Sequence, residues 1–272
     1  ANETGGVFVR QLPVLLPSGR LIIPIFRCIT TPGEKWVGNS DDSAVMISDD
    51  GGATWSEHVL PGSLGCVHMN IQPVADGSLL ALFRSRWADS IYESRSTDDG
   101  TTWSEPVPTE LPNNNSSIQF TALADGRLAL VYNHSRADAS TERRLSLYDE
   151  IDDDGLAAEQ GQVTEPDAAA FPDDGGRRAF WGTPRSPMTL AISEDSGRSW
   201  PVRRNLDVGD GYCLSNNSRD GLNREYSYPS IHQGPDGALN IAYTYFRQAI
   251  KFVRVDPQWA YEGSTTPGGD EQ

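Results

Sequence analysis

The chain has few basic residues, few cysteines and no long apolar segment, and each shortage excludes a class of protein. Lys and Arg total 22 against 38 Asp and Glu, and the net charge of −16 argues against a nucleic-acid partner. The three cysteines, Cys28, Cys66 and Cys213, form no CxxC pair, so neither a disulfide framework nor a metal site is predicted. No apolar run reaches the roughly 18 residues of a membrane-spanning helix.

What the chain does contain is typical of a large globular β-protein. Hydrophobic residues make up 37%, and 26 Gly and 18 Pro are spread along the chain at turn-like intervals. Acid is concentrated between Asp149 and Asp174, where no Lys or Arg occurs. We interpret this stretch as part of a solvated insertion over about residues 137–183, without a function of its own. No secretory signal is recognisable at Ala1, which leaves the compartment open, and nothing requires a cofactor.

An eight-residue motif, Ser-x-Asp-x-Gly-x-(Thr/Ser)-Trp, occurs three times. Its copies begin at Ser48, Ser96 and Ser193, with their aspartates at Asp50, Asp98 and Asp195. Such a motif is typical of a tight turn between antiparallel strands, in which the Asp accepts backbone N–H groups, Gly takes a positive φ and Trp packs beneath. We therefore assign these aspartates a structural role.

A second signal is a glycine-centred turn between two apolar runs, at Gly19, Gly77, Gly126 and Gly237. Together the two signals divide the chain into four units of four strands, over about residues 7–60, 66–110, 117–206 and 226–260. Four-stranded units that repeat at this spacing are typical of β-propeller blades. The sequence predicts one all-β propeller domain over residues 1–272.

The motif that contains Asp50, Asp98 and Asp195 is the Asp box, and the chain resembles the sialidase superfamily. The resemblance implies six blades, of which about four are present. Because residue 7 already enters an innermost strand, we expect the first two blades of the family pattern to be missing. An open edge is then expected, covered by those blades or by another chain.

In a propeller the innermost strand starts at the ligand face, so positions at a fixed distance before each turn glycine should meet there. Nine residues before the glycines stand Arg10, His68, Ser117 and Tyr228, and other arginines end second strands at Arg27, Arg84 and Arg247. Guanidinium groups bind carboxylates bidentately, so this set predicts an acidic carbohydrate as partner. The alternative is that these arginines pair with surface carboxylates.

The resemblance adds roles for individual residues. It implies that Arg84 and Arg185 bind the substrate carboxylate and that Tyr228 is the nucleophile, with Tyr226 on the same side of the strand. His68 stands where the family has the Glu that activates this Tyr. Glu225 is a possible substitute, although neighbouring strand residues point to opposite faces. The first carboxylate-binding Arg and the acid/base Asp are expected in the missing blades.

Three functions agree with this pattern. The first is a sialidase-like exo-glycosidase acting on an acidic sugar such as sialic acid, with Tyr228 and His68 as catalytic residues. The second is a lyase or hydrolase of another acidic glycan, and the third is a propeller that only binds sugar. A shared fold does not decide among them.

Overall fold

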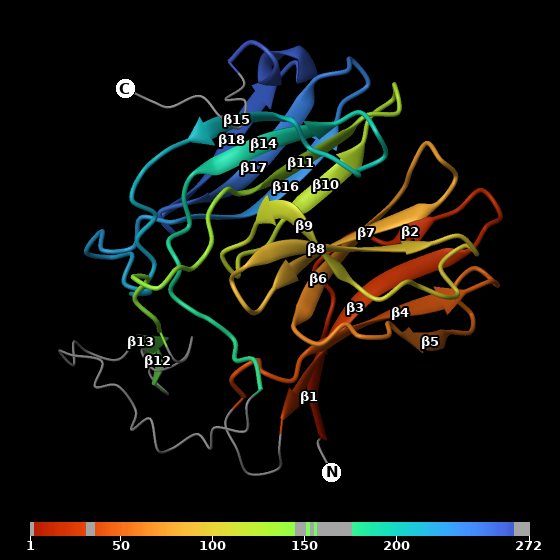
Figure 1. Ribbon diagram of the computed structural model, residues 1–272, viewed down its shortest axis with the longest axis horizontal. Helices are drawn as coiled ribbons and strands as arrows, with labels where there is room; N and C mark the ends of the chain where they lie inside the picture. Colours follow the sequence, from red (N-terminus) through yellow and green to blue (C-terminus); the bar gives the residue numbers. More distant parts are fainter. Residues whose placement is uncertain (1–2, 31–35, 145–150, 153–154, 157–175, 264–272) are drawn as a thin grey trace.

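The computed structural model describes residues 3–30, 36–144, 151–152, 155–156 and 176–263 of the chain. Within this part, nearly all regular structure is antiparallel β-sheet, and the helical element is a single 3-10 turn, η2 (Pro257–Ala260). No helix among these residues is long and apolar enough to cross a membrane. The prediction of an all-β propeller fold is confirmed, with four sheets arranged as blades (Figure 1).

Each sheet is built from consecutive segments of the chain. The first comprises β1 (Glu3–Phe8), β2 (Val14–Leu15), β3 (Leu21–Thr30), β4 (Asp42–Ser48) and β5 (Ser56–Val59). The second comprises β6 (Cys66–Pro73), β7 (Leu79–Ser85), β8 (Ser90–Ser96) and β9 (Val107–Pro112). The third comprises β10 (Gln119–Ala122), β11 (Leu128–Asn133), β14 (Met188–Ser193) and β15 (Val202–Asp207), and the fourth β16 (Tyr226–Gln233), β17 (Leu239–Tyr245) and β18 (Ala249–Val255). A short hairpin, β12 (Ile151–Asp152) with β13 (Gly155–Leu156), stands apart from the sheets.

The core consists of apolar layers between consecutive sheets. Ile22 and Val45 of the first sheet pack in one cluster with Ile71 and Phe83 of the second. Equivalent clusters lie between the second and third sheets and between the third and fourth. Because strands of the middle sheets bury both faces, β7 and β11 are continuous apolar runs instead of alternating ones.

The turn glycines lie where the sequence places them, at the ends of inner strands. Gly19, Gly77, Gly126 and Gly237 have φ values of 88°, 84°, 87° and 83°. At Gly19, Gly77 and Gly237 an added Cβ would meet no atom within 4 Å. Glycine is therefore favoured there by the positive φ, and not by a lack of space for a side chain.

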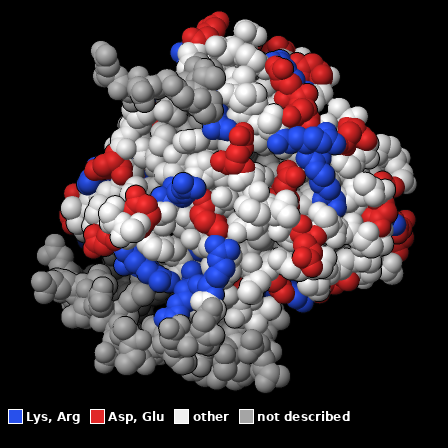
Figure 2. Space-filling model, in the orientation of Figure 1, with Lys and Arg blue, Asp and Glu red and all other residues white. Residues whose placement is uncertain are grey.

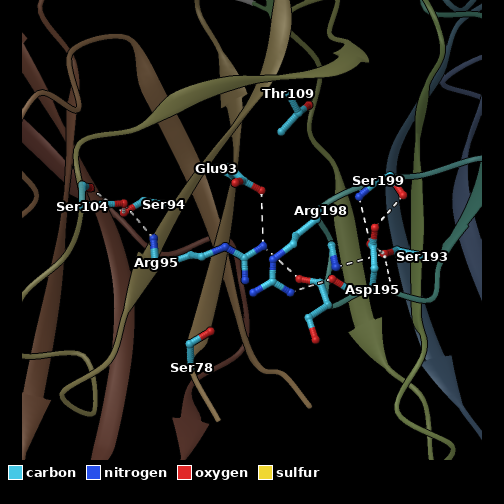
Figure 3. Close-up of polar contacts among 12 residues, drawn as sticks. Ser78, Glu93, Ser94, Arg95, Ser104, Thr109, Ser193, Asp195, Arg198 and Ser199 are labelled. Atoms are coloured by element: carbon cyan, nitrogen blue, oxygen red, sulfur yellow. Dashed lines mark hydrogen bonds and ion pairs between the residues drawn. The ribbon is translucent and has the colours of Figure 1, made fainter. Parts of the chain in front are cut away.

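The three Asp boxes connect the last two strands of each of the first three sheets. In the third box, Asp195 accepts hydrogen bonds from the backbone N–H of Ser199 at 2.9 Å and from the hydroxyl groups of Ser193 and Ser199 (Figure 3). Asp50 and Asp98 make the same contacts in their own turns. Arg198 extends from the third box to Asp76 of the second sheet at 2.7 Å, which ties neighbouring blades together.

Replacing Asp98 with Ala is expected to lower the free energy of unfolding by about 1 kcal/mol or more, because the Thr102 N–H and two hydroxyl groups lose their acceptor. Chemical denaturation measures this loss. Thr97→Ala, an exposed neighbour in the same turn, is the control and is expected to be nearly neutral. An Asp98→Ala protein of unchanged stability but altered ligand specificity would contradict the structural role.

The acidic insertion predicted over residues 137–183 falls largely outside the described residues, which lack 145–150, 153–154 and 157–175. Its described start, residues 138–143, is mostly exposed, but its described end is not a solvated loop. Trp181 is 2% exposed, and its ring nitrogen donates to the Val37 carbonyl at 3.1 Å, while the Phe180 N–H donates to the Arg86 carbonyl at 2.7 Å. The end of the insertion therefore packs against the first two sheets. Over the face shown in Figure 2, acidic and basic side chains of the described residues are scattered.

Exposed apolar side chains occur on the first and last sheets of the series. Val7 and Leu12 lie on or beside β1 and are 54% and 72% exposed, and Ile250 and Phe252 of β18 are 70% and 61% exposed. Large exposed apolar residues are unusual when they stand together on one strand. That further blades or another chain cover these faces stays a prediction.

Candidate functional site

A cavity of about 570 Å³ opens at the end of the inner strands where the sequence predicts the ligand face. Aromatic rings and ionisable groups both line it. It is lined by Gly5, Phe8, Phe26, Cys28, Thr30, Trp36, His68, Arg84, Arg86 and Tyr228. Cavities of this size accommodate small organic ligands, and the mixture of apolar wall and converging polar groups is typical of a binding site.

Breaks in the inner strands expose the polar groups to this cavity. The pairing of β6 with β7 shifts register between Val67 and Asn70, and that of β16 with β17 shifts between Ser227 and Ser230. His68 and Tyr228 lie inside these two bulges with φ values of 54° and 53°. Left-handed backbone is unfavourable for such bulky residues and is found mainly at functional positions. The bulges also interrupt the strand alternation.

This interruption separates Tyr228 from Tyr226, which the sequence had placed on the same side of the strand. The Tyr226 ring is buried against Tyr243 and Tyr245, and its hydroxyl donates to the Val208 carbonyl at 3.1 Å. Tyr226 therefore belongs to the core, whereas Tyr228 faces the cavity.

Cationic side chains surround Tyr228. The guanidinium carbons of Arg185 and Arg10 lie 5.5 Å and 5.8 Å from the centroid of the Tyr228 ring, and Arg84 interacts with its hydroxyl. Burial alone raises the pKa of this phenol, but the charges of Arg84 and Arg185 outweigh burial and lower it to about 7. Tyr228 is thus far more acidic than an ordinary tyrosine.

Arg84 is a buried cation, and one nitrogen of its guanidinium group has no hydrogen-bond acceptor. Its side chain is 1% exposed, its Nε donates to Asn115 Oδ1 at 2.8 Å, and its Nη2 has no hydrogen-bond partner. Burial lowers the pKa of this guanidinium to about 9, so it remains charged at neutral pH. A buried N–H group without a partner costs free energy, and an anionic ligand in the cavity would satisfy it.

His68 lies beside Tyr228, with 6.4 Å between the ring centroids. Its Nδ1 is 3.2 Å from the Ser117 hydroxyl. Burial, with Arg84 and Arg86 as further causes, lowers the pKa of His68 well below its ordinary value. The imidazole is therefore neutral at physiological pH and accepts or donates hydrogen bonds without adding charge.

Glu225 was a possible substitute for the Glu that activates the family's tyrosine, but its carboxylate is paired with two arginines. It is 1% exposed, and its Oε1 accepts from Arg185 at 2.9 Å, from Arg247 at 3.0 Å and from the Ser227 hydroxyl at 2.6 Å. Burial raises the pKa of this carboxyl, but the two arginines outweigh burial and lower it to about 2. Glu225 fixes Arg185 beside Tyr228 and holds Arg247 on its other side.

The other arginines predicted at the ligand face do not all lie at the cavity. Arg10 lies at the cavity edge, where its Nη2 donates to the Pro229 carbonyl at 3.3 Å. The sequence had assigned the first carboxylate-binding arginine to blades outside this chain, yet Arg10 joins Arg84 and Arg185 around one tyrosine. Arg27 lies away from the cavity lining and forms ion pairs with Asp42 at 2.5 Å and Glu57 at 3.2 Å. The contacts of Arg27 thus agree with the alternative in which an arginine of this set pairs with surface carboxylates.

The buried pair of Arg86 with Asp41 is a feature that the sequence reasoning missed. Arg86 Nη2 lies 2.7 Å from Asp41 Oδ2, and the guanidinium lies between the rings of Trp36 and Trp181, 5.3 Å and 5.0 Å from their centroids. Asp41 Oδ1 also accepts from the Trp36 ring nitrogen at 2.8 Å. This cluster joins the first sheet, the second sheet and the end of the insertion into one cavity wall.

No Asp or Glu is among the described residues that line the cavity. The described part of the chain also contains no group of three or more His, Cys, Asp or Glu residues placed to hold a metal ion. The described site consequently offers a tyrosine, a neutral histidine and arginines as its chemical groups.

Comparison with known proteins places the chain in a family. A model of the BNR repeat-like domain matches residues 5–241. A Hadza microbial sialidase has a TM-score of 0.58 and 16% identity over 91% of this chain, a leech intramolecular trans-sialidase 0.58 and 16% over 94%, and an intramolecular trans-sialidase from Ruminococcus gnavus 0.51 and 20% over 88%. The match covers 37%, 32% and 41% of those chains, so this chain spans well under half of their length.

No curated protein matches the chain significantly in sequence. At identities of 14–20%, the likeness to solved sialidases shows a shared fold and carries no substrate over to this chain. The family match, in contrast, covers most of the sequence. The chain has a sialidase-like propeller fold and belongs to the BNR repeat-like domain family.

Proposed function

We propose that the chain binds an acidic sugar in the cavity and cleaves its glycosidic bond with Tyr228 as nucleophile, as a sialidase-like exo-glycosidase. The observation that carries this proposal is the exposure of one unusually acidic tyrosine to a cavity in which Arg10, Arg84 and Arg185 surround it. A tyrosine hydroxyl is a suitable nucleophile at such a site, because the surrounding guanidinium groups stabilise negative charge on its oxygen and on the sugar carboxylate together.

In this proposal Arg84 and Arg10 bind the sugar carboxylate, because neither is paired with a protein carboxylate in its recorded contacts. Tyr228 Oη attacks the anomeric carbon as the bond to the leaving oxygen breaks, and a glycosyl–tyrosine intermediate forms. Water then attacks the anomeric carbon and releases Tyr228, so the anomeric configuration is retained. The aromatic wall of Phe8, Phe26 and Trp36 offers apolar surface to the sugar face.

Aryl glycosides are the appropriate first substrates. Their phenol leaving groups depart without strong protonation, and no carboxyl group lines the described cavity to act as a general acid. We expect an aryl α-sialoside to be cleaved faster than a natural sialoside, with retained configuration when product is followed by proton NMR. The same spectra separate free sugar from the anhydro-sugar named as the ligand of the leech enzyme. Inversion of configuration would rule out Tyr228 as a nucleophile.

A second function is favoured by one specific feature, the absence of a carboxyl acid among the described lining residues. In β-elimination from a 4-linked uronic-acid polymer, arginines neutralise the uronate, Tyr228 phenolate removes the C5 proton, and the resulting phenol returns that proton to the departing O4. The double bond forms between C4 and C5, and no second acid is required. Incubation with polyuronates tests this function, because the conjugated product absorbs in the ultraviolet and a hydrolysis product does not. Binding without turnover in both assays would identify a sugar-binding propeller.

A further inference from the structure

We propose that Arg84 and Arg185 hold Tyr228 as a resident phenolate, so that this pair of arginines takes over the activating role that the sialidase resemblance gives to a Glu at the His68 position. The inference deepens the proposed function, because the use made of the phenolate rests on that function. The existence of the phenolate rests only on the charges and contacts around the cavity.

The first step is the balance of charge at the cavity. Four guanidinium groups face it or its tyrosine, those of Arg10, Arg84, Arg86 and Arg185. Asp41 pairs with Arg86, and Glu225 pairs with Arg185 and also with Arg247. Buried cations are normally compensated by anions, since an unpaired charge away from water is unfavourable.

Arg10 and Arg84 lack such a carboxylate in their recorded contacts. The Arg10 guanidinium donates to a backbone carbonyl, and Arg84 donates to the amide oxygen of Asn115. The described residues around Tyr228 therefore carry more positive than negative charge. This excess favours an anion inside the cavity even before a substrate enters.

The second step identifies which group becomes that anion. His68 is neutral and supplies no negative charge, and burial raises the pKa of the Cys28 thiol to about 12. Tyr228 is the remaining ionisable hydroxyl of the lining, and it is acted on by Arg84 of β7 and by Arg185 of the segment before β14. Glu225 opposes its ionisation only weakly, because its own charge is shared by two arginines.

The same balance of charges indicates the charge of the ligand. Once the phenolate is present, at least one positive charge still lacks a counter-ion, and the free Nη2 of Arg84 marks a place for an acceptor. The cavity thus fits a sugar with one carboxylate, such as a sialic or uronic acid, better than a neutral sugar. A Glu at position 68 would add a negative charge and remove this positive excess. The neutral His68 leaves the excess in place, and the low pKa of Tyr228 depends on it.

Ultraviolet difference titration of the intact protein tests the inference without any substrate. The absorbance of tyrosinate is followed against pH for the wild type and for Tyr228→Phe. We expect the wild type to show one tyrosine ionising near pH 7 and the variant to lack that step. Tyr92→Phe is the matched control, because burial raises the pKa of Tyr92 and its removal should leave the neutral step unchanged.

Two further variants test the cause of the ionisation. Arg84→Gln removes a positive charge and should move the step to higher pH, and His68→Glu introduces a negative charge beside the phenol and should move it in the same direction. Circular dichroism establishes that each variant is folded. If Arg84→Gln fails to fold, His68→Glu and the comparison with Tyr228→Phe still decide.

The inference is overturned if the folded wild type and Tyr228→Phe differ only by a tyrosine that ionises at the ordinary pKa of about 10. It is also overturned if the neutral step persists unchanged in folded His68→Glu. These outcomes are separate from the proposed function. If a tyrosine ionises near pH 7 but no acidic sugar is cleaved, the phenolate inference stands and the proposed glycosidase activity is wrong.

Discussion

Replacing Tyr228 with Phe is expected to lower turnover of an aryl α-sialoside by roughly 10³-fold or more without weakening ligand affinity. The change removes only the hydroxyl group. The Phe ring keeps the place of the tyrosine ring against Arg185 and Arg10, so the guanidinium groups around it stay in position. Steady-state kinetics measure kcat, and calorimetry with a non-hydrolysed acidic sugar measures affinity.

Tyr226→Phe is the matched control, because it removes a hydroxyl two residues away that donates to the Val208 carbonyl in the core. That variant should lose some stability and keep its turnover. A sugar-binding propeller would show no turnover in any form of the protein, and its affinity would be insensitive to the loss of the Tyr228 hydroxyl. If Tyr228→Phe retained full turnover, both the nucleophile in hydrolysis and the base in elimination would have to be another group.

Much of the fold was predictable because its signals are local and repeated. Each turn glycine needs a positive φ, and each Asp box satisfies its own backbone N–H groups, so both patterns can be recognised without knowledge of the rest of the chain. The distance from turn to ligand face is also set by strand length. For this reason His68 and Tyr228 could be placed together although 160 positions separate them in the sequence.

What the sequence could not predict depends on long-range packing. The bulges at His68 and Tyr228 put bulky residues at positive φ, and nothing in their local sequence favours that conformation. Strict alternation therefore put Tyr226 beside Tyr228, and the structure separates them. Trp181 stands against Arg84 and Arg86 only because the end of the insertion packs on the first two sheets, and the pairing of Asp41 with Arg86 joins positions 45 residues apart that no local pattern connects.

Breaking the buried pair of Asp41 and Arg86 is expected to destabilise the protein strongly. Asp41 is 0% exposed and Arg86 is 2% exposed, and the guanidinium is enclosed by Trp36 and Trp181. Asp41→Ala would leave this cation without a counter-ion and the Trp36 ring nitrogen without its acceptor. Removing one partner of such a pair typically costs about 3 to 5 kcal/mol of unfolding free energy.

Asp42→Ala provides the comparison at the adjacent position. The Asp42 carboxylate pairs with Arg27, both side chains are about one-fifth exposed, and water can replace the lost contact, so a loss of no more than about 1 kcal/mol is expected. Urea denaturation of the two variants measures the difference. Asp41→Ala combined with Arg86→Met should recover part of the loss, because the double variant leaves no buried charge unpaired. An Asp41→Ala protein as stable as Asp42→Ala would mean that water reaches Arg86 and that the Trp36 and Trp181 rings around it separate in solution.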